Sequence, residues 1–165
     1  KVDFELYMGG MPPVSESISS NSDALLDGNW HHCVVTADRS ANLTMYIDGS
    51  AQSDTEDISG TTGDVNHDHA SYPLVIGRYS KSASKYWNGQ IDEVAIWDVV
   101  LSSADVTSIY NSGKPNNLTL SASYDTDRTG QLVAYWRFED DYTDSSTNSN
   151  TGAAVNEAGF STSVP

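Results

Sequence analysis

The sequence predicts an all-β fold, arranged as a two-sheet antiparallel jelly-roll sandwich with one short helix. Apolar residues mostly alternate with polar ones, which is typical of strands with one buried face. The alternating runs are short, and loops rich in Ser, Thr, Asn, Asp and Gly separate them. One segment has helical spacing with start and stop signals, and no solenoid-type repeat is visible. Many short strands with a single helix favour a sandwich over an α/β fold.

The individual strands are predicted from these short alternating runs. They cover residues 2–8, 30–37, 43–47, 72–77, 91–100 and 132–138. Asp48-Gly49 follows the third run and has the composition of a tight hairpin turn. Residues 11–28 contain Pro12-Pro13 and several serines, so we expect a loop with little regular structure. Residues 52–70 are expected to form an acidic loop.

The helix is predicted just after residue 100. Ser102 and Asp105 have the spacing of a capping box, with Asp in place of the usual Glu. Gly113 and Pro115 supply the stop signal. Three apolar side chains would face the core: Val106, Ile109 and Tyr110.

Composition limits the partners that the chain can have. The 165 residues suffice for one domain, and we treat residues 1–165 as a single domain that lacks upstream sequence. The chain carries 8 basic and 23 acidic residues, for a net charge of −15. Nucleic acids and anionic membranes attract basic surfaces, so neither is an expected partner. No apolar run reaches the roughly 18 residues that span a bilayer, so no membrane insertion is expected.

Two regions of the sequence resemble a known family. Residues 27–36 (DGNWHHCVVT) and 43–49 (LTMYIDG) are similar to the signature of laminin-G-like domains. Residues 73–78 (PLVIGR) and 86–97 (YWNGQIDEVAIW) resemble its later strands, and the helical segment 101–113 follows them as it does in the family. These domains belong to the concanavalin A-like lectin/glucanase superfamily, so the resemblance implies a jelly-roll sandwich. A helix in this place is similar to prokaryotic and viral members of the family. The order with residues 131–152 after the helix is similar to surface proteins of tailed phages.

The C-terminal segment stands in an unusual order. Residues 131–152 are similar to the segment that often opens a laminin-G-like domain, although here they follow the helix. We therefore expect residues 116–165 either to close the sandwich or to contact a partner.

Asp92 is the strongest candidate for a metal ligand. By strand alternation it shares a face with Val94 and Ile96 and would point into the sandwich, where an ionised carboxylate is costly unless it is paired. In the family that the sequence resembles, the matching Asp is often a calcium ligand. Calcium takes about six to eight oxygen ligands, and the polar loop 144–150 can supply them. The predicted ligands are Asp92, Asp144, Asn148 and Asn150. Backbone N–H groups or Arg137 are the alternative partners of Asp92.

Aromatic residues gather around the loop between the strands expected at 72–77 and 91–100. An aromatic ring beside amide groups can stack against a pyranose and hydrogen-bond its hydroxyls. The predicted glycan-binding residues are Tyr79, Tyr86, Trp87 and Asn88. The alternative for Tyr86 and Trp87 is packing against the sheet, as the matching aromatic residue of the family generally does.

No catalytic constellation is visible. The related glucanases carry their carboxylates in an E-x-D-x-x-E pattern on one strand, whereas Asp92 and Glu93 are adjacent and would point to opposite faces. The single cysteine, Cys33, lies in an expected strand without cues for a lowered thiol pKa. We expect that the chain is not an enzyme.

Taken together, these features predict a non-enzymatic adhesion or decoration module on a virion or extracellular surface, and the virion location is implied by the resemblance alone. Its expected partner is a glycan or surface polysaccharide, and calcium is the expected cofactor. The alternative is a purely structural protein that binds neighbouring protein subunits without recognising sugar. A third alternative is a fragment of a glycosidase or lyase whose catalytic part lies upstream.

Overall fold

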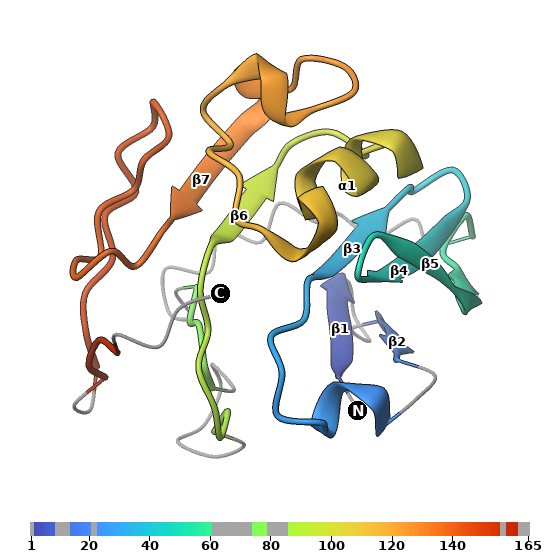
Figure 1. Ribbon diagram of the computed structural model, residues 1–165. Coiled ribbons are helices and arrows are strands. Elements are labelled where there is room, and N and C mark those ends of the chain that lie inside the picture. The colour runs from blue at the N-terminus through green and yellow to red at the C-terminus, as the bar shows by residue number, and fades with distance from the viewer. Residues whose placement is uncertain are drawn as a thin grey trace.

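In a computed structural model, the described residues are 2–8, 14–20, 23–60, 74–78, 86–155 and 158–161 (Figure 1). The strands in this part of the chain form three antiparallel sheets, in the orders β1-β2, β3-β4-β5 and β6-β7. Their bounds are β1 Asp3–Met8, β2 Val14–Ser19, β3 Cys33–Ala37, β4 Asn42–Ile47, β5 Ser50–Asp57, β6 Val94–Trp97 and β7 Leu132–Trp136. Helix α1, Ser103–Tyr110, is the one α-helix of the described residues. Short 3-10 turns lie at Asp23–Leu26, Asn111–Gly113, Ser121–Ser123 and Thr129–Gln131. The predicted antiparallel all-β fold with one short helix is confirmed.

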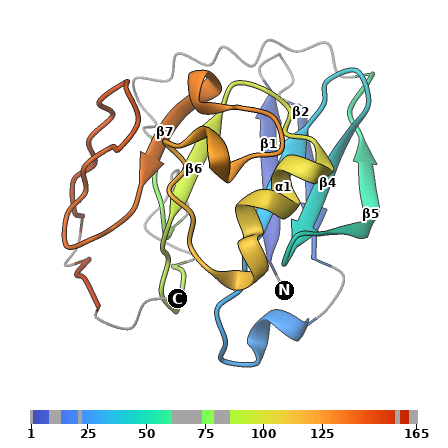
Figure 2. The same cartoon turned by 45° about the horizontal axis from the view of Figure 1, so that its top comes forward.

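The central β3–β4–β5 sheet is covered on both faces because its strands alternate between two cores. Leu43 and Met45 of β4 are fully buried against Ile18 of β2 and Ile58. Tyr46, the next residue along β4, belongs to a second core made with α1 and β7. In Figures 1 and 2, α1 accordingly lies between this sheet and the β6–β7 pair. β1 pairs with β2, and Ile18 of β2 brings this pair against the sheet.

Two segments predicted as loops contain strands. Residues 11–28 include β2 and a 3-10 turn, and residues 52–57 belong to β5, so both predictions were wrong. The polar composition of β5 gave no alternating apolar pattern by which to predict it. This strand lies at the edge of its sheet and pairs only with β4 among the described residues. Edge strands tolerate charged side chains that central strands do not.

Three predicted strands are shorter than expected. Residues 74–78 contain no strand and bend at 76–78, and 72–73 lie outside the described residues. The run 91–100 contributes only β6, because Glu93 has a left-handed backbone with φ of 53° and the chain bends after Trp97. The run 30–37 contributes only β3, which begins at Cys33.

The predicted capping box of α1 is confirmed. The Ser102 hydroxyl accepts a hydrogen bond from the Asp105 N–H at 3.1 Å, and the Asp105 carboxylate accepts one from the Ser102 N–H at 3.2 Å. The helix ends earlier than the Gly113 signal, because Asn111 adopts a left-handed conformation. In the described residues no helix has the length and apolar character that a membrane span needs.

The predicted hairpin turn between β4 and β5 is also confirmed. Asp48 and Gly49 both have positive φ angles, 50° and 76°, as a two-residue turn of this kind requires. A side chain at Gly49 would meet the Tyr110 ring of α1 at 2.9 Å, so glycine also permits the helix to pack closely on the turn.

Candidate functional site

The β6–β7 pair has two apolar faces, of which one packs into the core. Ala95 and Tyr135 face each other across the pair and pack toward α1. Ile96 and Ala134 face each other on the opposite side and line an open groove together with Trp136. Because paired residues of an antiparallel ladder point to the same face, the register alone assigns these side chains to opposite sides.

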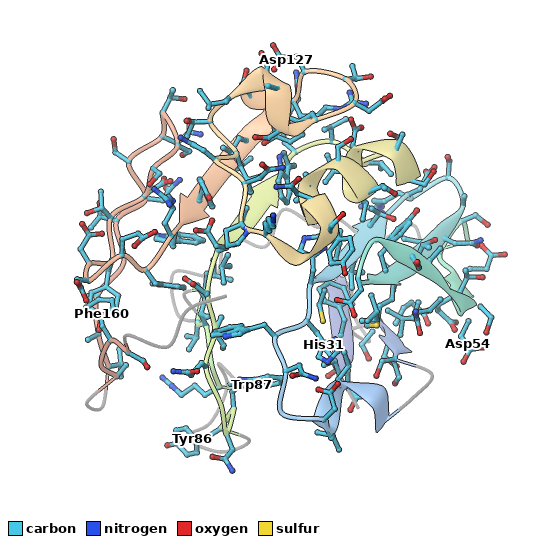
Figure 3. The ribbon with its side chains drawn as sticks, viewed as in Figure 1. His31, Asp54, Tyr86, Trp87, Asp127 and Phe160 are labelled. Carbon is cyan, nitrogen blue, oxygen red and sulfur yellow. The ribbon has the colours of Figure 1, made fainter. Side chains whose placement is uncertain are left out.

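Two segments form the walls of this groove. Residues 74–78, 86–87 and 89–92 line one wall, and residues 150–155 with 158–161 line the other. The two segments of the first wall are joined by the backbone N–H of Trp87, which donates to the Gly77 carbonyl at 2.8 Å. Figure 3 shows Tyr86 and Trp87 on the first wall and Phe160 on the other. The groove has a volume of about 1080 Å³, just above the range of roughly 300–1,000 Å³ typical of ligand sites.

Most exposed apolar side chains of the described residues line the groove. They are Trp30, Leu74, Ile76, Tyr86, Trp87, Ile96, Val155 and Phe160. Leu26, Val100 and Leu120 are the exposed large apolar residues outside it in the described chain. Apolar surface gathered in one hollow is typical of a binding site, whereas isolated exposed apolar residues are ordinary.

Trp87 is held as a rigid, open aromatic surface. Its indole N–H donates to the carbonyl of Gln90 at 3.2 Å, while 51% of the residue remains exposed. A side chain at Gly89 would lie 3.0 Å from the indole nitrogen, so only glycine leaves the ring undisturbed there. A polar ligand therefore meets the face of this ring without having to order it first.

The opposite wall is also aromatic. Tyr142 packs against Phe138 and Phe160, with ring centroids 6.4 and 4.7 Å apart. The Tyr142 hydroxyl donates to the Ala158 carbonyl at 2.8 Å, which ties residues 158–161 to the wall. Trp136 donates its indole N–H to the Asn150 carbonyl at 2.9 Å. Aromatic residues therefore line both walls of the groove.

Charged groups are sparse in the groove. Among its described lining residues only Arg78 and Asp92 carry a charge. Asp92 is half-buried, and one of its oxygens accepts a hydrogen bond from the Glu93 N–H at 3.0 Å. Burial raises the pKa of Asp92, and the charge of Glu139 adds to this, whereas the Glu93 N–H and Arg137 oppose it.

The neighbouring carboxylate, Glu93, turns away from Asp92 into a separate cluster. It hydrogen-bonds the Tyr135 hydroxyl and lies 3.4 Å from the Arg137 guanidinium. Burial is the main cause that raises the pKa of Glu93. The described groove lining therefore holds one carboxylate, whereas hydrolysis of a glycosidic bond generally uses two about 5–9.5 Å apart. Desolvation also raises the pKa of the Cys33 thiol, which disfavours the reactive thiolate.

The structure places two of the four predicted glycan-binding residues in the groove. Tyr86 and Trp87 line it and are more than half exposed, so packing against the sheet does not cover them. Asn88 is exposed but is not among the lining residues. Tyr79 lies outside the described residues.

The loop 144–150, which was predicted to hold calcium, is attached to β7 by hydrogen bonds. The buried Asp144 carboxylate accepts hydrogen bonds from the N–H groups of Tyr135, Ser146 and Asn150 at 2.7–2.9 Å, and from the Ser146 hydroxyl. Burial works against ionisation, but these bonds together hold the pKa of Asp144 below its usual value. The side-chain amides of Asn148 and Asn150 donate to β7 carbonyls at 2.9–3.1 Å.

This arrangement does not fit a calcium site as it stands. A cation at Asp144 would displace donors that already satisfy both carboxylate oxygens. Nor do three or more acidic, His or Cys side chains gather into a cluster suited to a metal ion anywhere in the described chain. Calcium binding by Asp92, Asp144, Asn148 and Asn150 stays a prediction from the sequence.

Several groove residues escaped sequence analysis. Trp30, Ile76, Tyr142 and Phe160 come from four separate segments, and no local pattern joins them. One signal was available: the runs 91–97 and 132–138 are apolar on both faces, although one face alone packs on the helix. A doubly apolar two-stranded sheet needs a second cover or a ligand.

Comparison with known proteins gives one match. A family model described as the concanavalin A-like lectin/glucanases superfamily matches residues 2–107, which is more than half of the chain. The match covers β1 to β6 and the first wall of the groove, and it ends inside α1. No curated protein and no solved structure matches the chain.

Proposed function

Because the chain belongs to the concanavalin A-like lectin/glucanases superfamily, we propose that its groove binds carbohydrate. Domains of the laminin-G-like type are typically binding modules, although the superfamily also includes glucanases. Fold alone does not determine function in such a family, so the proposal depends on the site.

The exposed and anchored Trp87 is the observation that carries the proposal. Sugar rings present C–H groups on one face and hydroxyls at their edges, so a fixed aromatic ring beside a few polar groups suits them. Trp87 supplies the ring, and Asp92 and Gln90 line the same groove with polar groups. The second aromatic wall favours a sugar held between two surfaces rather than on an open plane.

The bound glycan is proposed to remain chemically unchanged. One carboxylate in the described lining, with Glu93 directed to Tyr135, supports binding without hydrolysis. Such a module would attach its bearer to glycan-coated surfaces, and we place it on a virion or extracellular surface. The polar and acidic composition supports an exposed position of this kind.

A glycan array tests this function. The wild-type chain should bind a defined set of glycans, and Trp87→Ala should weaken that binding at least tenfold, because the loss removes a central aromatic contact. Leu120→Ala is the matched control, since it shortens an exposed apolar residue outside the groove. No binding by a chain shown to be folded, or equal binding by both variants, would remove the proposal.

A second function is favoured by the aliphatic part of the groove. Leu74 is 65% exposed and Val155 is 55% exposed, and aliphatic side chains recognise protein surfaces better than sugars. This observation favours a structural protein whose groove receives a neighbouring subunit. Light scattering in the absence of sugar distinguishes these two functions. Oligomers that dissociate in the Leu74→Asp variant would support the subunit contact, and a stable monomer would support glycan binding.

Calcium is a separate proposal carried by the sequence resemblance. If the metal is bound, a chelator should lower the melting temperature, and Asp92→Ala should abolish that response. A melting temperature that does not respond to calcium or chelator would mean that hydrogen bonds of Asp144, Asn148 and Asn150 hold the loop to β7 without a metal.

A further inference from the structure

Asp92 brings the only carboxylate to the described lining of the groove, and part of its bonding capacity is open. Its Oδ1 accepts a hydrogen bond from the Glu93 N–H at 3.0 Å. No group in the described chain donates a hydrogen bond to its Oδ2. Oδ2 is not among the buried side-chain atoms that lack a hydrogen bond, so it is in contact with solvent, and a ligand hydroxyl can donate to it in place of water.

The surroundings of Asp92 favour an uncharged donor. The negative charge of Glu139 repels that of Asp92, whereas the positive charge of Arg137 attracts it. Arg137 already forms ion pairs with Glu93 and Glu139. Arg78, the other charged residue of the described lining, also has partners within the chain. An acidic sugar bound beside Asp92 would thus bring its carboxylate or sulfate close to a like charge. The net charge of −15 adds to the repulsion at long range.

We propose that Asp92 is a specificity-determining residue of the groove, whose Oδ2 accepts hydrogen bonds from the hydroxyls of an uncharged sugar and whose charge excludes acidic sugars. This inference rests on the proposed function, because it needs a sugar in the groove. It names the substrate class as neutral oligosaccharides, and excludes uronate-containing, sialylated and sulfated ones. The walls provide stacking for any pyranose, and Asp92 selects among them by charge.

The test compares Asp92→Asn with a matched control on one array. The array holds neutral oligomers of glucose, galactose, mannose and N-acetylglucosamine beside oligogalacturonate, sialylated and sulfated glycans. The control is Asp54→Asn, which makes the same change of charge on exposed β5, far from Phe160 and Trp87 in Figure 3. Each variant is first shown to melt like the wild type, and all binding is measured with and without a chelator.

The wild type is expected to bind neutral members and to reject acidic ones. Asp92→Asn should weaken binding of neutral glycans at least tenfold, the size expected for a hydrogen bond to a charged group. It should also reduce the difference in affinity between neutral and acidic glycans. Asp54→Asn should change neither. These results should be the same in chelator, because the carboxylate contacts the sugar directly.

Three outcomes overturn the inference. Asp92→Asn that binds neutral glycans as tightly as the wild type, while Trp87→Ala does not, removes the role of Asp92 and leaves the groove as a sugar site. A wild type that prefers acidic glycans, or that loses neutral ones in chelator, contradicts direct acceptance by Asp92. Absence of binding to every member by the folded wild type removes the proposed function as well.

Discussion

The two faces of the β6–β7 pair differ in what covers them, although both are apolar. On one face, Tyr135 and Leu132 are buried and pack in the same core as Leu101, Val106 and other residues around α1. On the other, Ile96 remains 37% exposed and lines the groove. The same two strands therefore contribute to stability through one face and, on our account, to binding through the other. The apolar composition of a face does not distinguish these roles, whereas the extent to which other residues bury that face does.

The largest effect should separate the two faces by stability. Tyr135→Ala should lower the free energy of unfolding by about 4 kcal/mol, because it empties a buried aromatic site and leaves Glu93 without its hydrogen bond. Ile96→Ala should cost only about 1 kcal/mol, because that side chain is already in contact with solvent. Urea unfolding of both variants measures the difference. Similar costs at the two positions would mean that the groove face is covered in solution.

A second prediction concerns the ionic contact that fastens the covered side. Asp105 is fully buried and accepts hydrogen bonds from the Thr126 N–H at 2.9 Å and from Arg128 at 3.0 Å, besides the capping contacts. Asp105→Ala should lower the free energy of unfolding by about 3 kcal/mol, because it leaves Arg128 without its ionic partner and removes the cap of the helix. Glycan binding should be retained, since none of these residues lines the groove.

The same contact predicts acid sensitivity with a definite sign. Burial opposes ionisation of Asp105, but the bonds from Thr126, Ser102 and Arg128 together hold its pKa below the usual value. A depressed folded-state pKa adds stability above the unfolded-state pKa of about 3.9, and this stability is lost as the pH falls through the folded-state pKa. Unfolding curves from pH 6 to pH 2 should show a smaller decline in Asp105→Ala than in the wild type. A parallel decline would argue against this assignment.

A smaller effect sharpens the groove side of the comparison. A methyl group at Gly89 would lie 3.0 Å from the Trp87 indole nitrogen, so Gly89→Ala should displace the ring by a few tenths of an ångström. We expect glycan affinity to fall severalfold while the free energy of unfolding changes by less than about 0.5 kcal/mol. Gly130→Ala is the control, because no described atom lies within 4 Å of the added methyl group. Unchanged affinity in Gly89→Ala would show that the orientation of Trp87 is unimportant.

The smallest effect lies outside both faces, at His31. Its ring nitrogens contact Asp48 at 2.8 Å and Asp27 at 3.0 Å, and these contacts raise the pKa of His31. A raised pKa contributes stability that is present below the unfolded-state value of about 6.5 and is lost as the pH rises through the folded-state pKa. The change should be a few tenths of a kcal/mol, because the pair is partly exposed. Melting curves of His31→Gln should lack this step between pH 5 and pH 9, with glycan binding unchanged.

Sequence alternation predicted the parts of the fold that depend on local contacts. Leu43, Met45 and the Asp48-Gly49 turn follow the expected pattern, and Ser102 with Asp105 forms the expected cap. The edge strand β5 was missed because its exposed residues carry no apolar signal. Along β7, a shift in register between Ile96 and Trp97 breaks simple alternation.

The candidate site was predicted only where one segment carries it. Tyr86 and Trp87 are neighbours in a loop, and their aromatic character was visible directly. The second wall, with Tyr142 and Phe160, depends on contacts between distant segments that no spacing announces. The loop 144–150 has the oxygen-rich composition of a metal site, but the same groups also serve as hydrogen-bond partners for β7, and composition alone does not distinguish these uses.

The indole signals of the four tryptophans offer the most direct test of the central claim. Trp30, Trp87 and Trp136 line the groove, whereas Trp97 packs on the core side and donates to the Tyr124 hydroxyl at 3.3 Å. Titration of ¹⁵N-labelled protein with a glycan found on the array should move the Trp87 indole resonance most and leave that of Trp97 in place. A glycan that binds with no change at the groove tryptophans, or that moves Trp97 alone, would contradict the account.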